Sequence, residues 1–305
     1  MTSSDIASTS AGLAFGHSRV ARWAAAGLRA AHGLAPDLAA RLAVHLFFTP
    51  FPTKLSTRRR VPPAWRAERL STGQEGFVLL RHRPTEQADL RRPRVLLVHG
   101  WAGDALQMRP LGEAVAAAGF EPVLMDLPAH GRSTGWRCTM PQIVRGLFEA
   151  QARCGPFDAI VAHSMGAVAG LHAMAHGLAA GRMVALAASS PPAAVLQWFG
   201  DAFGLAPGLL ARMRQRIEER ERMALEQFGP DLLGARVQVP VLLVHDRGDR
   251  MAPVTNSTAL ANALPAATLR ITEGLSHRRI LADAQVVEWT LSHLAGREGS
   301  DGRAD

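Results

Sequence analysis

The chain has 305 residues, 48% of them hydrophobic and 20% charged, which is ordinary for a globular protein with a substantial core. No apolar run approaches the roughly 20 residues that span a bilayer, and no secretory signal is evident, so we expect a cytoplasmic protein without stable membrane insertion. The net charge of +8 is almost entirely arginine without a long basic block, so nucleic acid is not an expected partner.

Residues 1–65 predict a tail followed by a helical extension. Residues 1–15 carry no periodic pattern, whereas 17–32 and 37–48 repeat apolar residues at helical spacing, as with Leu38, Leu42 and Leu46. We expect both helices to pack on the main domain. The alternative is a basic amphipathic helix that lies on a membrane surface.

From residue 66 onward, short apolar segments alternate with helical ones. Strands are expected at 75–82, 94–99, 122–126, 158–163, 183–189, 240–245 and 267–272, and helices at 105–118, 140–152, 165–179, 256–263 and 283–294. Apolar runs such as Val95–Val98 are typical of strands buried on both faces. The pattern predicts an α/β fold with a doubly wound, mostly parallel sheet, formed by residues 66–190 and 238–305.

The alternation stops between residues 191 and 237, which predicts an inserted helical lid. This segment starts with two prolines and includes a charged stretch from Arg212 to Glu226 that we expect to be one helix. Opposite charges at Glu218 and Arg222 are spaced to support that helix.

Ser164 is the candidate nucleophile. It lies between the apolar run 158–163 and a helix of small residues, and Ala162 and Gly166 flank it at two positions on either side. A strand, a serine among small residues and then a helix are what a nucleophile elbow requires, because the turn is too tight for larger side chains.

The partners of such a serine are expected in loops at the ends of later strands. Asp249 precedes Pro253 in the loop after 240–245, and we prefer it as the acid to the nearby Asp246. His277 follows the last strand, which gives the chain order Ser, Asp, His of a catalytic triad. We expect His130, in the loop after 122–126, to organise that loop, and His163 to pack in the elbow.

Backbone N–H groups near Ser164 are candidates for an oxyanion hole. Gly100 ends the strand 94–99 and lets the chain turn, so the N–H of Trp101 can point into the site. The N–H of Met165, at the start of the following helix, is the second candidate.

Together these motifs resemble the α/β-hydrolase family over about residues 66–295. The resemblance rests on His-Gly after the third strand, Asp-x-Pro-x-His-Gly-x-Ser after the fourth, the elbow, the Asp loop and the Gly-x-x-His loop. The sequence departs from the family at Ala162, where glycine is commoner, and at Asp246. The resemblance implies a serine hydrolase with a short helical lid that forms an acyl-enzyme, and neither a metal nor an organic cofactor is expected.

The expected activity is hydrolysis of a small carboxylic ester with a short or medium acyl chain. Trp101, Trp198, Phe199 and Phe203 are the candidates for an apolar substrate pocket, although the lid aromatics can equally serve to pack the lid onto the core. Thioesterase, lipase-like, amidase and acyltransferase activities use the same chemistry and stay open. A different kind of alternative is a non-catalytic ligand-binding protein with the hydrolase fold. The oligomeric state is not predicted.

Overall fold

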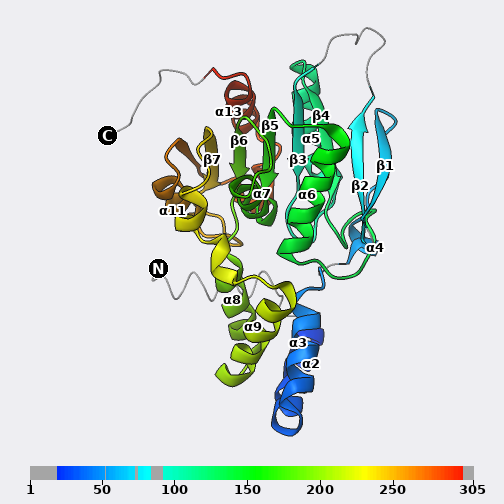
Figure 1. Ribbon diagram of the computed structural model, residues 1–305, viewed down its shortest axis with the longest axis vertical. Helices are drawn as coiled ribbons and strands as arrows, with labels where there is room; N and C mark the ends of the chain where they lie inside the picture. The colour runs from blue at the N-terminus through cyan, green and yellow to red at the C-terminus, as the bar shows by residue number, and fades with distance from the viewer. Residues whose placement is uncertain (1–18, 52, 73–74, 84–91, 298–305) are drawn as a thin grey trace.

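A single eight-stranded sheet forms the centre of the molecule, with helices on both of its faces (Figure 1). The computed structural model describes residues 19–51, 53–72, 75–83 and 92–297, so the expected tail over 1–15 lies outside the described residues. The strand order is β1-β2-β4-β3-β5-β6-β7-β8. Strand β2 pairs antiparallel with both of its neighbours and all other pairs are parallel, which confirms the mostly parallel, doubly wound sheet.

The central strands lie where their apolar runs predicted them. They are β3 (Arg94–Val98), β4 (Glu121–Asp126), β5 (Ala159–His163), β6 (Met183–Leu186) and β7 (Val241–Asp246), with β8 (Ala267–Thr272) at one edge. Every residue of β5, β6 and β7 is buried, as expected for strands covered on both faces.

The opposite edge contains a strand that the sequence analysis did not predict. β1 (Trp65–Thr72) pairs along its whole length with β2 (Glu75–His82). Trp65 is buried, but Arg66 and Arg69 are exposed, so the segment lacks an apolar run. Its strand conformation depends on the hydrogen bonds it makes with β2 rather than on its own pattern.

Two apolar clusters flank the sheet. One contains residues of α6 (Met140–Cys154), α7 (Met165–Ala175) and α11 (Thr255–Ala263). The other contains residues of η1 (Ala105–Met108), α5 (Arg109–Ala117) and α13 (Ala284–Leu294). Short helices α4 (Lys54–Thr57) and α12 (Ser276–Arg279) complete this part. The carboxyl ends of the parallel strands therefore all lie at the same end of the sheet, between the two helical layers.

A four-helix cap lies beside this carboxyl end of the sheet, at the lower end of the view in Figure 1. It consists of α8 (Pro192–Phe203) and α9 (Pro207–Glu221) from the expected lid, and α2 (Arg19–Leu34) and α3 (Pro36–Phe47) from the N-terminal part. Helix α3 contacts α9, and α2 contacts α8. The expectation that the N-terminal helices pack on the main domain is therefore wrong, because the lid helices supply the apolar faces that they cover.

The charged helix of the lid is shorter than predicted. α9 ends at Glu221, because Arg222 adopts a left-handed φ of 52°, and η2 (Leu225–Phe228) and α10 (Pro230–Gly234) follow. Glu218 lies 3.2 Å from Arg214, one turn earlier in the helix, and its carboxylate also accepts the N–H of Leu225. Among the described helices, none has the length and apolar character needed to cross a membrane.

Candidate active site

Ser164 occupies a sharp turn between β5 and α7. Its φ of 53° and ψ of −121° are strained for a residue with a side chain, and its N–H donates to the Leu186 carbonyl at 2.9 Å. A Cβ atom at Gly166 would lie 2.5 Å from the His99 carbonyl oxygen, and one at Gly100 would lie 2.8 Å from the Ser164 Cβ. The backbone at His99 and Gly100 therefore packs closely enough against the strained turn to hold it and to keep the hydroxyl exposed to the site.

The structure brings Ser164, His277 and Asp249 into one hydrogen-bonded chain. His277 Nε2 lies 3.0 Å from Ser164 Oγ, and His277 Nδ1 lies 2.6 Å from Asp249 Oδ2. The other carboxylate oxygen of Asp249 accepts the N–H groups of Met251 and Ala252 at 2.8 and 3.0 Å. All three side chains are largely buried. The aspartate is thus fixed by its own loop and orients the imidazole toward the serine.

Asp246 has a different position from Asp249. One of its oxygens accepts the Thr272 hydroxyl at 3.1 Å and the Leu275 N–H at 2.8 Å, and the other accepts the Gly248 N–H at 3.0 Å. Burial opposes the charged form, but these hydrogen bonds outweigh it and lower the pKa of the carboxyl. Asp246 therefore ties the loop of Asp249 to the loop of His277 without reaching the imidazole, a role that the sequence analysis had not assigned.

Two further histidines support the same loops. His163 Nε2 lies 2.8 Å from the His277 carbonyl oxygen, and burial together with the adjacent His277 lowers the pKa of His163, so the ring is neutral and donates. His245 bonds the Ser257 hydroxyl at 2.7 Å and the Ala252 carbonyl at 2.8 Å. The expected packing of His163 in the elbow is confirmed, whereas no sequence pattern indicated its bond to the loop of His277.

The two candidate oxyanion-hole residues flank the serine. Met165 is the first residue of α7, where N–H groups have no acceptor within the helix. Trp101 directly follows Gly100, the residue packed against Ser164. The chain after Trp101 is held by His130, whose Nε2 accepts the Ala102 N–H at 3.0 Å while its Nδ1 donates to the Pro128 carbonyl at 2.7 Å.

These bonds confirm the loop-organising role of His130. Burial lowers the pKa of His130 to about 3 and that of the adjacent His99 to about 4, so both rings are neutral. His99 Nε2 accepts the Leu127 N–H at 3.1 Å, and Asp126 accepts the N–H groups of Ala105 and Arg132. The residues of the Asp-x-Pro-x-His-Gly-x-Ser motif thus shape the backbone beside the site and do not face the nucleophile.

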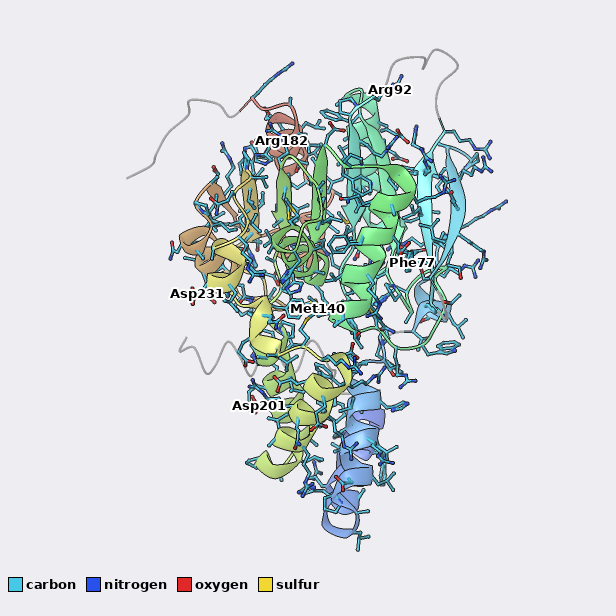
Figure 2. The ribbon with its side chains drawn as sticks, in the orientation of Figure 1. Phe77, Arg92, Met140, Arg182, Asp201 and Asp231 are labelled. Carbon is cyan, nitrogen blue, oxygen red and sulfur yellow. The ribbon has the colours of Figure 1, made fainter. Side chains whose placement is uncertain are left out.

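A cavity of about 250 Å³ opens onto Ser164 and His277. Its walls come from the core and from the cap, and Met140 lies at the junction of the two in Figure 2. The apolar and aromatic lining includes Phe47, Phe48, Phe51, Trp101, Met140, Val168, Trp198, Ile217 and Phe228. Polar side chains also line it, namely Gln107, Ser189, Ser190, Arg278 and a pair in which the Thr139 hydroxyl lies 3.1 Å from the carboxylate of Glu221.

Only part of the expected pocket lines this cavity. Trp101 and Trp198 do, but Phe199 and Phe203 do not. The rings of Phe199 and Phe203 stack at 4.4 Å, and Phe199 packs edge-to-face on Phe47 at 5.4 Å. The prediction is wrong for these two phenylalanines, because they face the N-terminal helices inside the cap.

Comparison with known proteins agrees with this architecture. The alpha/beta hydrolase fold family matches residues 93–236, a segment that contains Ser164 and most of the lid. The chain has the α/β-hydrolase fold. Among curated proteins, none matches this sequence.

Solved structures of several hydrolases superpose on most of the chain. A serine hydrolase from the polyaromatic-hydrocarbon-degrading bacterium Cycloclasticus zankles is 15% identical, with a TM-score of 0.58 over 78% of this chain and 100% of its own. 2-Hydroxy-6-oxo-6-phenylhexa-2,4-dienoate hydrolase from Rhodococcus is 19% identical, with a TM-score of 0.56 over 76% of this chain and 99% of its own. Mouse alpha/beta hydrolase domain-containing protein 10 is 15% identical, with a TM-score of 0.57 over 76% of this chain and 97% of its own. At these identities the likeness establishes the fold alone.

Proposed function

We propose that this α/β-hydrolase-fold protein is a serine hydrolase that cleaves a carboxylic ester with a short or medium acyl chain. The observation that carries the proposal is the hydrogen-bonded chain from Ser164 through His277 to Asp249. Its Ser164 and His277 line a largely apolar cavity. A hydroxyl is a weak nucleophile by itself, and a base within hydrogen-bond reach that is oriented by a carboxylate is what activates it.

The first half of the proposed reaction forms the acyl-enzyme. Ser164 Oγ attacks the ester carbonyl carbon while His277 Nε2 takes the hydroxyl proton, and Asp249 stabilises the imidazolium that results. The N–H groups of Trp101 and Met165 stabilise the negative oxygen of the tetrahedral intermediate. When the intermediate collapses, His277 gives its proton to the departing alcohol.

The second half releases the acid. Water attacks the acyl carbon of the ester between the acyl group and Ser164, and His277 takes a proton from this water. The new tetrahedral intermediate collapses, the proton returns to Ser164 Oγ, and the carboxylic acid leaves. Each step uses groups of this chain and water, so the cycle ends with the enzyme in its starting state.

The lining of the cavity favours a substrate with an apolar acyl group. Its wall is mainly aromatic and aliphatic side chains with fewer polar ones, as is usual for small-molecule sites. The same attack on a thioester or an amide would differ only in the leaving group, so these substrates are the first alternatives to compare with esters.

The test is labelling with a fluorophosphonate and turnover of p-nitrophenyl esters of increasing chain length, for the wild type, Ser164→Ala and Ser292→Ala. We expect the wild type and Ser292→Ala, a change on α13 away from the site, to label and to turn over esters. We expect Ser164→Ala to do neither. Labelling that persists in Ser164→Ala would show that another residue is the nucleophile. A wild type that neither labels nor turns over any ester, thioester or amide would favour the ligand-binding alternative.

A further inference from the structure

The positive charge of the chain is concentrated in residues 19–60. This segment, which includes the hairpin formed by α2 and α3, has eight basic residues and one acidic residue, a net charge of +7 against +8 for the whole chain. The single acid, Asp37, lies 3.3 Å from both Arg212 and Arg216 of α9 and is therefore already neutralised. The rest of the molecule is close to electrically balanced.

The same segment also exposes most of the large apolar side chains found on the surface. Of the eight such side chains in the described part of the chain, six belong to this segment: Trp23, Leu34, Leu38, Leu42, Phe51 and Leu55. Trp23 is 78% exposed and Leu34 89% exposed. Apolar side chains this exposed and this close in sequence are typical of an interaction surface rather than of scattered surface residues.

The exposed residues follow the geometry of the helices. Trp23 and Leu34 are separated by about three turns and so share one side of α2, and Leu38 and Leu42 are one turn apart on α3. Ala39, Ala43 and other small residues of α3 are buried against the cap. Arg22 and Arg41 are exposed beside the apolar positions. Helix α2 buries Ala25 and Leu28, so each helix has one buried side and an outer side of large apolar and basic residues.

The hairpin projects from the hydrolase core (Figure 1). Its base is attached, since the Cys138 N–H donates to the Phe48 carbonyl at 2.9 Å and α3 ends there. The turn between α2 and α3, next to Leu34 and Leu38, lies at the other end. Helices α8 and α9 cover one side of the hairpin, and the outer side is exposed.

We propose that the outer face of the α2–α3 hairpin docks on the surface of a bilayer that contains anionic lipid. Tryptophan and leucine favour the headgroup–acyl boundary, and each arginine near the surface is attracted to anionic headgroups. The helices have 16 and 12 residues, too short to span the bilayer, so the attachment is peripheral. On the hairpin itself, Arg22 and Arg41 are exposed beside the apolar residues, and its one acid, Asp37, is paired with α9. This local excess of positive charge is what selects an anionic lipid surface over a neutral partner.

The docking face adjoins the cavity. Phe51 is 67% exposed and also lines the cavity, and Phe47 and Phe48 at the end of α3 line it too. Attachment through the hairpin therefore keeps the cavity mouth near the membrane surface. Lipid docking does not depend on the proposed hydrolysis and can be tested without a substrate.

The test is sedimentation of the full chain with vesicles of phosphatidylcholine alone or of phosphatidylcholine with phosphatidylglycerol. We expect binding to the anionic vesicles that weakens at high salt, and little binding to the neutral ones. Leu38→Glu/Leu42→Glu should weaken binding about tenfold or more, because two charges enter the apolar strip. Arg41→Gln should weaken it about fivefold, the contribution of one surface arginine.

The matched control is Leu232→Glu, a substitution on α10 at a leucine that is 50% exposed, as Leu42 is. This variant should bind like the wild type, and circular dichroism should give the same thermal midpoint for all variants. Equal binding of both vesicle types, or unchanged binding of the double leucine variant, would overturn the proposal. So would a wild-type dimer in light scattering that becomes a monomer in the double variant while no vesicle binds, because the face would then be an interface between two copies.

Discussion

The two aspartates of the β7 loop show how a difference of three residues separates two roles. Asp249 lies 2.6 Å from the imidazole of His277, whereas Asp246 bonds the backbone that carries this histidine. A carboxylate on the ring stabilises a developing positive charge, and a carboxylate on a loop N–H stabilises a conformation. Their removal should therefore affect different measurements.

We predict that Asp249→Asn lowers kcat on the order of 10,000-fold, since an amide cannot stabilise the imidazolium or hold the required tautomer. Asp246→Asn should keep most of the turnover, with a lower thermal midpoint, because the loop of His277 loses charge-assisted hydrogen bonds. Steady-state kinetics with a p-nitrophenyl ester and thermal unfolding of both variants check this. The reverse pattern of rates would show that Asp246 is the acid.

At the scale of elements, the cap is built from two segments that are distant in sequence. Residues of α2 and α3 share one apolar cluster with residues of α8 and α9, including Phe199, Phe203 and Met213. The neighbouring aromatic residues Trp198 and Phe199 point to different places, one to the cavity and one to the cap interior. This adjacent pair allows substrate selectivity and cap stability to be separated.

We predict that Trp198→Ala extends the range of accepted p-nitrophenyl esters to longer chains, because a wall of the cavity is removed. Phe199→Ala should leave the chain-length profile unchanged and destabilise the cap by about 3–5 kcal/mol through the void it creates. Turnover across the ester series and urea unfolding measure the two effects. A changed profile in Phe199→Ala with normal stability would place that ring in the substrate path.

The elements that could be predicted from sequence are those whose pattern is set by local burial. Val95–Val98 is apolar throughout because both faces of β3 are covered, so its run is visible without the structure. β1 could not be predicted, because exposed Arg66 and Arg69 break its pattern and only pairing with β2 makes it a strand. The end of α9 was also missed, since charged residues continue past Glu221.

The candidate site follows the same division. Ser164, Asp249 and His277 could be placed from their order and from their positions after strands, and the structure brings them together. Phe199 and Phe203 were misplaced because periodicity shows that a helix face is apolar but not which partner covers it. That partner is the hairpin more than a hundred residues earlier in the chain.

At the scale of the whole molecule, several buried histidines link stability to pH. Burial lowers the pKa of His99, His130, His163, His172 and His245, so these rings are neutral in the folded protein. In the unfolded chain a histidine has a pKa of about 6.5. Between that value and the folded pKa the unfolded state binds more protons, so the free energy of unfolding rises with pH. The stabilisation is therefore complete above about pH 6.5 and is lost as the pH falls.

We predict that the free energy of unfolding in urea falls between pH 7 and pH 5, by up to about 1.4 kcal/mol per pH unit for each such histidine. Burial raises the pKa of Asp126, so the contribution of this carboxyl has the opposite sign. His130, with a pKa of about 3, is the most direct test. His130→Asn should lower stability at pH 7, because the Ala102 N–H loses its acceptor, and should also reduce the slope of stability against pH by nearly one proton. If the slope of the free energy of unfolding against urea concentration is the same at every pH, the unfolded state is unchanged across the range. Equal slopes of stability against pH for His130→Asn and the wild type would contradict the neutral, buried state of this histidine.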